Sequence, residues 1–351
     1  MSKTDRGRFL EDFRLGETLI HAVPRTITSG DVALYTALYG SRFALFASDS
    51  FARSMGLPGA PLDPLLVFHS VFGKSVPDVS LNAVANLGYA EGRFLAPVYS
   101  GDTLSATSEV IGLKENSNGR TGVVYVRTTG RNQDGADVLS YARWVMVRKR
   151  DTDAAVETHV PELAASVPAA GLAVPQGLSA AAFDPALAGT RHFWEDYEAG
   201  ERIDHVDGMT IEEAEHRLAT RLYHNTARVH FNSHAERGER FGRCIVYGGH
   251  IISLAHGLSF NGLAGSLGVA AINAGRHVAP CFAGDTIYAW SEILERAALP
   301  GRSDLGALRL RLIAAKDRPC HDFPDQIGTG YDPAVVLDLD IWTLMPRRGA
   351  T

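Results

Sequence analysis

The sequence predicts an α+β protein made of two copies of one unit, in which a curved antiparallel β-sheet wraps around a central α-helix. Three observations support this prediction. The two halves of the chain repeat each other, helical segments precede consecutive strands in each half, and one helix per half is apolar on all sides. A helix that is apolar all round must be buried, and a curved antiparallel sheet can cover it.

The repeat appears as short landmarks that recur at a nearly constant spacing. Residues 9–13 (FLEDF) are echoed by residues 193–197 (FWEDY), 184 positions later. Further pairs recur in the same order at 184 or 183 positions, as expected of a duplicated unit. They are Gly16-Glu17 with Gly200-Glu201, Leu38-Tyr39 with Leu222-Tyr223, Gly92-Arg93 with Gly275-Arg276, Pro97 with Pro280, and Gly101-Asp102-Thr103 with Gly284-Asp285-Thr286.

The repeat also defines the domain organisation. Residues 1–150 form the first unit and residues 191–351 the second. Residues 151–190 are rich in alanine and proline, which predicts an extended linker packed over the surface. The unit ends, 144–148 and 342–346, are 198 positions apart. An insertion of about 15 residues is therefore expected in the second unit, near residues 319–333.

The elements of each unit follow one order: an acidic turn, a capped helix, a buried helix and then three strands. Thr28 and Thr210 are the predicted helix N-caps, because acidic residues follow them in the first turn. The apolar helices are expected over 65–72 and 251–258. The strands, rich in β-branched residues, are expected over 104–111, 122–129 and 138–149, and over 287–294, 308–315 and 335–345.

Composition excludes several classes of protein. A net charge of -6 gives no electrostatic surface for nucleic acid. No apolar run approaches the roughly 20 residues of a membrane span, and the polar start of the chain lacks a signal-peptide core. Three dispersed cysteines, Cys244, Cys281 and Cys320, form neither a disulfide framework nor a zinc motif. We therefore expect a cytoplasmic protein.

Several motifs indicate a family. Asn225-Thr-Ala-Arg-Val-His230 is followed by Ile245-Val-Tyr-Gly-Gly-His250 and by the strand start Gly284-Asp-Thr-Ile287. With residues 38–45 and 316–323, they make the chain similar over nearly its whole length to the MaoC-like enoyl-CoA hydratases, which have a tandem (double) hot-dog fold. Within that superfamily the chain resembles the mesaconyl-CoA hydratases, also called β-methylmalyl-CoA dehydratases. The superfamily's catalytic aspartate corresponds to Asn225, so the usual Asp/His pair is altered.

The resemblance implies a reaction and its partners. The expected activity is the reversible hydration of mesaconyl-CoA (2-methylfumaryl-CoA) to β-methylmalyl-CoA, within the C4/C5 acyl-CoA metabolism of the ethylmalonyl-CoA pathway. The partner is then a small acyl-CoA thioester, and no cofactor is needed because CoA is part of the substrate. Exposed sheet edges favour a homo-oligomer, a dimer or higher.

The repeat serves as an internal control for the site. At the offset of 184, His230 lies opposite Phe46, which cannot move a proton, and Gly248 lies opposite Pro64, which has no N–H. Asn225 lies opposite Ser41, and Gly249 opposite Leu65. We therefore expect one active site per chain, built mainly by the second unit.

Hydration of an unsaturated thioester requires a base and a group that stabilises an enolate-like oxygen. His230 is the predicted base, and Asn225 is expected to hold the water through its amide oxygen. Gly248 and Gly249 precede an apolar helix, where a thioester carbonyl could approach unpaired amides at the positive end of the helix. They are the predicted oxyanion site.

Other residues have narrower predicted roles. Arg228 and then Arg276 are candidates to hold the free carboxylate of the substrate. His250 is a candidate second catalytic group or a helix-start residue, and Tyr247 stands where the family usually has histidine. His230 and His234 have the i, i+4 spacing of metal ligands but lack the glutamate of the zincin motif, so no metal is expected.

Three alternatives remain at this stage. The first is an (R)-specific hydratase for straight-chain enoyl-CoA, which would not need a carboxylate-binding arginine. The second is a hot-dog thioesterase, which would release a free thiol. The third is a non-catalytic acyl-CoA-binding protein, favoured by Asn225 and recognised by stabilisation on ligand binding without turnover.

Overall fold

One antiparallel sheet of ten strands runs through the computed structural model, which describes residues 3–349. Its strand order is β1-β3-β4-β5-β2-β7-β12-β9-β8-β6, so each half of the chain supplies five neighbouring strands. The first five are β1 (Thr18–Thr26), β2 (Ala83–Phe94), β3 (Thr103–Glu115), β4 (Thr121–Arg131) and β5 (Asp137–Arg148). The others are β6 (Arg202–Thr210), β7 (Val269–His277), β8 (Thr286–Ala298), β9 (Leu305–Lys316) and β12 (Val335–Pro346).

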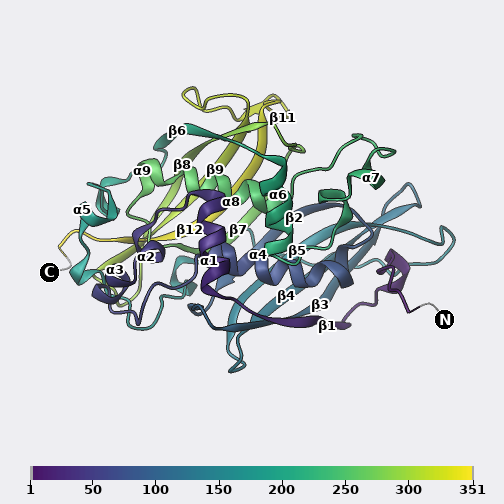
Figure 1. Cartoon of the computed structure of the whole chain (residues 1–351), viewed down its shortest axis with the longest axis horizontal. Helices are drawn as coiled ribbons and strands as arrows, with labels where there is room; N and C mark the ends of the chain where they lie inside the picture. Colours follow the sequence, from purple (N-terminus) through teal and green to yellow (C-terminus); the bar gives the residue numbers. More distant parts are fainter. Residues whose placement is uncertain (1–2, 350–351) are drawn as a thin grey trace.

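The helices lie across one face of this sheet (Figure 1). The longer ones are α1 (Ser29–Tyr39), α4 (Pro64–Ser75), α6 (Glu213–Leu222) and α8 (Gly248–Leu258). The short ones are α2 (Ala44–Ala47), α3 (Asp49–Ser54), α5 (Pro185–Ala188), α7 (Ser233–Glu236) and α9 (Phe260–Leu263). No helix within residues 3–349 is long and apolar enough to cross a membrane.

The two apolar segments form the buried helices α4 and α8, as predicted. The helices begin 184 residues apart, at Pro64 and Gly248, and side chains from both join one hydrophobic core. They also contact each other, because His69 Nε2 of α4 lies 2.9 Å from Ser253 Oγ of α8. The two units therefore share one core at their centre.

The predicted N-caps differ in outcome. Thr28 caps α1 as expected: its side chain accepts a hydrogen bond from the Asp31 amide, and the Asp31 carboxylate bonds back to Thr28. The prediction for Thr210 is wrong, because this residue remains in β6, with its Oγ1 2.8 Å from Thr286 Oγ1. Helix α6 starts later, after Glu212, without a side-chain cap.

The six predicted strands are present, but the sequence did not reveal β1, β2, β6 and β7. Strands β2 and β7 are the most consequential omission, because they pair with each other and join the two halves into one sheet. Tyr89 lies opposite Gly275 and Ala90 opposite Ala274 at this junction.

The predicted insertion is a short hairpin, β10 (Gln326–Ile327) with β11 (Gly330–Tyr331), between β9 and β12. It covers the face of the sheet opposite the helices, where Arg311 of β9 binds both Asp325 and Asp338. The linker packs against the second half as well, since the indole of Trp342 donates to the Val167 carbonyl at 2.9 Å.

Candidate active site

His230 lies in a short 3-10 turn, Arg228–His230, that follows α6. Its Nδ1 is 2.9 Å from the carbonyl oxygen of Ile245. A carbonyl oxygen can only accept, so Nδ1 carries the proton and Nε2 has the free lone pair. Nε2 has no partner within residues 3–349 and is not sealed from solvent. His230 therefore has the tautomer of a general base.

Burial keeps the imidazole of His230 neutral. It lowers the pKa of His230 to about 4, although the hydrogen bond to the Ile245 carbonyl acts in the opposite direction. A half-buried ring in this environment is unprotonated at neutral pH and can accept a proton from water.

The N-terminus of α8 lies beside this base. Tyr247 is the N-cap residue but provides no side-chain cap, and its ring centroid is 5.6 Å from that of His230. The amides of Gly248 and Gly249 have no acceptor within residues 3–349. Two unpaired N–H groups at the positive end of a helix form a site for a developing negative charge.

The two glycines also have a packing role that the sequence did not indicate. A Cβ on Gly248 would lie 2.4 Å from Cε1 of His277, and a Cβ on Gly249 would lie 2.4 Å from Cε1 of Tyr247 and 2.6 Å from the ring of His69. The space in front of both Cα atoms is thus filled by side chains. An oxyanion could therefore reach the amide N–H groups of these glycines but not the space in front of their Cα atoms.

His277, at the end of β7, is a site residue that the sequence analysis missed. Its ring contacts Gly248, and its Nε2 is 3.1 Å from the hydroxyl of Tyr89. Burial, and next the neighbouring His230, lower the pKa of His277 to about 4. Within the described part of the chain, its side-chain hydrogen bond is the one made by Nε2, which leaves Nδ1 for a ligand. A signal existed in the repeat, because the offset of 183 places Phe94 opposite His277.

Asn225 is buried in the turn after α6, with 4% of its surface exposed. Its Oδ1 accepts from the amide of Ala227 at 3.0 Å. This bond uses one of the two lone pairs of Oδ1, so the expectation that this oxygen holds the water stays a prediction. The amide nitrogen of Asn225 offers a ligand a donor as well.

The two arginines predicted to bind the substrate carboxylate do not both point toward His230 and the start of α8. Arg228 is exposed on the turn and forms no ion pair within residues 3–349. Arg276 lies opposite Asp338 on the face of the sheet covered by the hairpin, 5.9 Å from the ring of Tyr331. Neighbouring residues of a strand point to opposite faces, so Arg276 points away from the face that holds His277.

The other two predicted residues are both buried. His250 is fully buried, with Nδ1 3.1 Å from the Tyr39 hydroxyl and Nε2 unpaired. It faces the core rather than the open side of His230, which favours the structural role. Tyr247 packs its ring against His230, and its hydroxyl is 3.3 Å from Nδ1 of His69.

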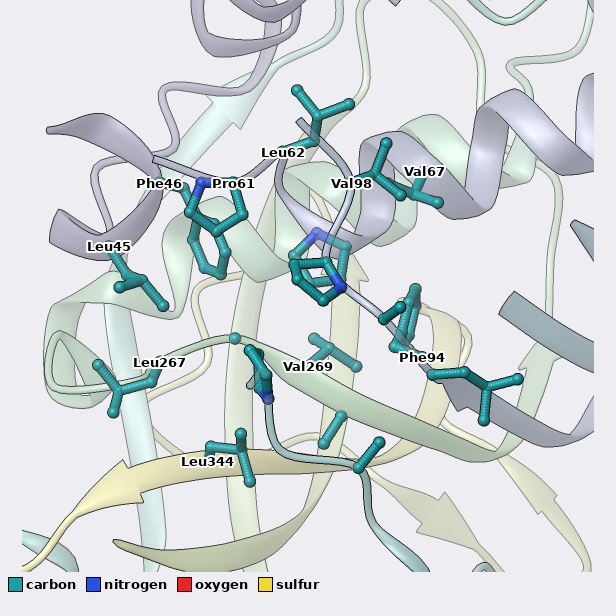
Figure 2. A pocket seen from close by; sticks show the side chains of 18 residues that line it. Leu45, Phe46, Pro61, Leu62, Val67, Phe94, Val98, Leu267, Val269 and Leu344 are labelled. Carbon is teal, nitrogen blue, oxygen red and sulfur yellow. The ribbon is translucent and has the colours of Figure 1, made fainter. Parts of the chain in front are cut away.

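The corresponding place in the first half is an apolar cavity of about 60 Å³. Figure 2 shows Phe46 and Pro61 on one wall and Leu344 across from them. Phe46 and Phe94 stand where the second half has His230 and His277. The start of α4 is also closed, because Pro64 has no N–H and the Asp63 carboxylate accepts from the Leu65 amide at 2.9 Å. The first half therefore has no counterpart of the two histidines or of the open start of α8.

Comparisons with known proteins agree with this fold. The chain aligns with a MaoC domain protein from Chloroflexus aurantiacus at 68% identity and a TM-score of 0.98, covering 99% of this chain and 100% of that one. A conserved hypothetical protein from Mycobacterium tuberculosis with a double hotdog fold aligns at 26% identity and a TM-score of 0.77, covering 96% and 98%. The fold and the site thus define a MaoC-like protein with two hot-dog units in one chain.

The chain belongs to the mesaconyl-CoA hydratase family, whose model matches residues 1–324. It is 68% identical to the β-methylmalyl-CoA dehydratase of Chloroflexus aurantiacus, covering 99% of both chains. It is 61% identical to the mesaconyl-CoA hydratase of Cereibacter sphaeroides, covering 98% of this chain and 100% of that relative.

Proposed function

We propose that this protein catalyses the reversible hydration of mesaconyl-CoA to β-methylmalyl-CoA. Two relatives, a β-methylmalyl-CoA dehydratase and a mesaconyl-CoA hydratase, match nearly the whole chain. The observation that carries the proposal is the open Nε2 of a neutral His230 beside the uncapped start of α8. Addition of water to an unsaturated thioester needs a base and an oxyanion site of this kind.

The geometry suggests how the protons move. His230 Nε2 takes a proton from water, and the hydroxide adds to Cβ. The electrons of the double bond then move onto the thioester oxygen. That oxygen is held by the amides of Gly248 and Gly249. The imidazolium of His230 returns its proton to Cα, which restores the thioester carbonyl and the neutral base. Asn225 does not take part as an acid or a base, because an amide does not titrate.

His277 completes the oxyanion site in this scheme. The buried Tyr89 hydroxyl keeps its proton, because burial raises the pKa of Tyr89, and donates it to Nε2 of His277. The tautomer with a proton on Nδ1 is then favoured. A neutral imidazole N–H can polarise a carbonyl without delivering a full charge. His230 and His277 thus use opposite ring nitrogens, one as acceptor and one as donor.

The absorbance of the conjugated enoyl-thioester tests the proposal. Purified wild type should remove this band from mesaconyl-CoA without releasing a free thiol, because hydration breaks the conjugation and leaves the thioester intact. Reaction with crotonyl-CoA alone would indicate a straight-chain hydratase, and thiol release would indicate a thioesterase. Thermal stabilisation by CoA esters without turnover would indicate a binding protein.

We also propose that the protein works as a cytoplasmic homo-oligomer and needs no cofactor beyond the CoA of its substrate. Three buried free thiols suit a reducing compartment. The edge strand β1 exposes Ile20 at 81% and Val23 at 65%, which a second copy could cover. Light scattering coupled to size-exclusion chromatography tests this, and a monomer at micromolar concentration would contradict it.

A further inference from the structure

Arg143 of β5 is a fully buried cation without a carboxylate partner. None of its surface is exposed, and no ion pair within residues 3–349 includes it. Its Nη2 donates to Ser75 Oγ at 2.8 Å, and both Nη atoms are 3.4 to 3.5 Å from Ser80 Oγ. Its Nε is buried without any hydrogen-bond partner. A buried guanidinium bonded only to hydroxyls is costly unless an anion pairs with it.

Other unsatisfied polar groups lie on the same side of the sheet. The hydroxyl of Tyr141, two residues from Arg143, has no hydrogen-bond partner, although Thr128 and Ser75 are near. Both side-chain atoms of the Asn86 amide are also buried and unpaired. Asn86 lies opposite Val145, and residues 141, 143 and 145 of a strand share one face. These three side chains offer N–H and O–H donors, which suit a carboxylate.

This donor cluster adjoins the active site. Arg143 lies opposite Tyr89 in the pairing of β5 with β2, and the Tyr89 hydroxyl contacts His277. The guanidinium carbon of Arg143 is 4.3 Å from the ring centroid of Phe72, which is 5.6 Å from that of Tyr247 at the start of α8. A single aromatic ring therefore separates the cation from the oxyanion site.

The repeat shows that the cation belongs to one half only. Trp144 and Trp342 are equivalent at an offset of 198, which places Ile341 opposite Arg143. The base His230 belongs to the second half, and its counterpart in the first half is Phe46. A site that needs both groups must draw on both units.

We propose that Arg143, with Tyr141 and Asn86, binds the free carboxylate of the acyl group, while the second half holds the thioester and activates water. This inference rests on the proposed function and specifies its substrate class as a short acyl-CoA with a terminal carboxylate. The carboxylate accepts from Nε of Arg143 and from the Tyr141 hydroxyl. Arg228 and Arg276 then have no part in holding it.

The test compares mesaconyl-CoA with 2-methylbut-2-enoyl-CoA, in which a methyl group replaces the carboxylate. Wild type should strongly prefer mesaconyl-CoA, because the methyl analogue leaves the buried cation unpaired. Arg143→Met should lower kcat/KM for mesaconyl-CoA by roughly 100-fold or more and leave that for the analogue within about threefold. Arg309→Met, on the opposite face of the sheet, is the matched control and should keep the wild-type ratio between the two substrates.

Two results would overturn the proposal. The first is a folded Arg143→Met variant that keeps the wild-type preference for mesaconyl-CoA. The second is loss of that preference in Arg228→Met instead. If Arg143→Met does not fold, Tyr141→Phe decides, because it removes only a hydroxyl. It should lower kcat/KM several-fold for mesaconyl-CoA alone, and equal effects on both substrates would contradict the proposal.

A binding measurement separates this proposal from the proposed reaction. Succinyl-CoA and butyryl-CoA also differ by a carboxylate in place of a methyl group. Both are saturated, so their binding can be measured without turnover. Wild type should bind succinyl-CoA more tightly, and Arg143→Met or Tyr141→Phe should reduce that difference. If this dependence holds while mesaconyl-CoA is not hydrated, the carboxylate site stands and the proposed reaction fails. If mesaconyl-CoA is hydrated but the difference does not depend on these residues, only the carboxylate site fails.

Discussion

The hydroxyl of Tyr223 donates a hydrogen bond to the hydroxyl of Tyr39 at 2.9 Å, and the two tyrosines occupy equivalent positions 184 residues apart. The contact between His69 and Ser253 joins residues with the same separation. Both contacts lie where the two units meet, so the core retains an approximate two-fold symmetry. The groups around it do not, because the second unit has histidines where the first has phenylalanines, and an unpaired Gly248 amide where the first has Pro64.

This symmetry predicts matched effects at two close contacts between helix and loop. A Cβ on Gly73 of α4 would lie 1.7 Å from the Tyr223 carbonyl oxygen, and a Cβ on Gly257 of α8 would lie 2.4 Å from the Tyr39 carbonyl oxygen. Gly73→Ala and Gly257→Ala should each lower the free energy of unfolding by about 1–3 kcal/mol or more. Urea denaturation measures this, and neutral effects at both positions would contradict the packing described.

Exchanging the caps of the two central helices tests the oxyanion site. Tyr247→Asp would copy Asp63 and place a carboxylate at the open start of α8. The carboxylate would accept a hydrogen bond from an amide at the start of α8 and would repel an enolate, so kcat should fall roughly 100-fold or more.

The matched control for this exchange is Asp63→Ala. It should cost about 1 kcal/mol of stability and leave kcat unchanged, since α4 carries no chemistry in this account. Normal turnover by Tyr247→Asp would show that the oxyanion is held elsewhere.

Replacing His277 by the residue of the first half tests its role. His277→Phe keeps the ring against Gly248 and removes its nitrogens, so kcat should fall about 10- to 100-fold with a smaller change in KM. Tyr89→Phe, which removes only the hydroxyl that holds Nε2, should have a weaker effect in the same direction. If KM rises while kcat is unchanged, so that kcat/KM falls by the same factor, His277 would act in substrate binding alone.

Much of the architecture could be predicted because duplication leaves a record in the sequence. The offset located α4 and α8, and the apolar character of both helices indicated burial. Strands β2 and β7 escaped prediction because their small residues, such as Gly92 and Gly275, resemble turns rather than strands. Their strand character depends on pairing with each other, which is a contact between the two halves.

The site was predictable only where the repeat or the family motif marked it. His230 followed from both, and His277 could have followed from its contrast with Phe94. Arg143 also differs from its counterpart Ile341, but that contrast alone does not indicate a site. An arginine in a strand is usually exposed or paired, and the missing counter-ion of Arg143 is visible only in three dimensions. The misplaced Arg276 shows the same limit, since the Gly-Arg repeat does not reveal which face of the sheet it occupies.

Stability should depend on pH through the buried histidines. Burial lowers the pKa of His69 and of His250 to about 3 each, whereas an unfolded histidine titrates near 6.5. Between these values the unfolded chain binds protons that the folded chain does not. The free energy of unfolding should therefore fall as the pH drops below 6.5, by about 1.4 kcal/mol per pH unit for each such histidine.

Urea titrations between pH 7.5 and 4.5 measure this slope. His250→Gln should reduce the slope by the contribution of one histidine, about 1.4 kcal/mol per pH unit. His192→Gln, which alters an exposed side chain, should leave the slope unchanged. An identical slope for wild type and His250→Gln would contradict the neutral state of His250 in the folded protein.

The most direct test of the central claim is the turnover of mesaconyl-CoA by His230→Gln, followed by loss of the enoyl-thioester absorbance. Glutamine keeps the size and polarity of the side chain but cannot accept the proton from water. If one histidine in the second unit is the base, kcat should fall by about 10²- to 10⁴-fold, with the fold and the binding of CoA esters retained. A folded His230→Gln variant that keeps more than about a tenth of the wild-type rate would contradict the account, because general-base catalysis contributes more than that.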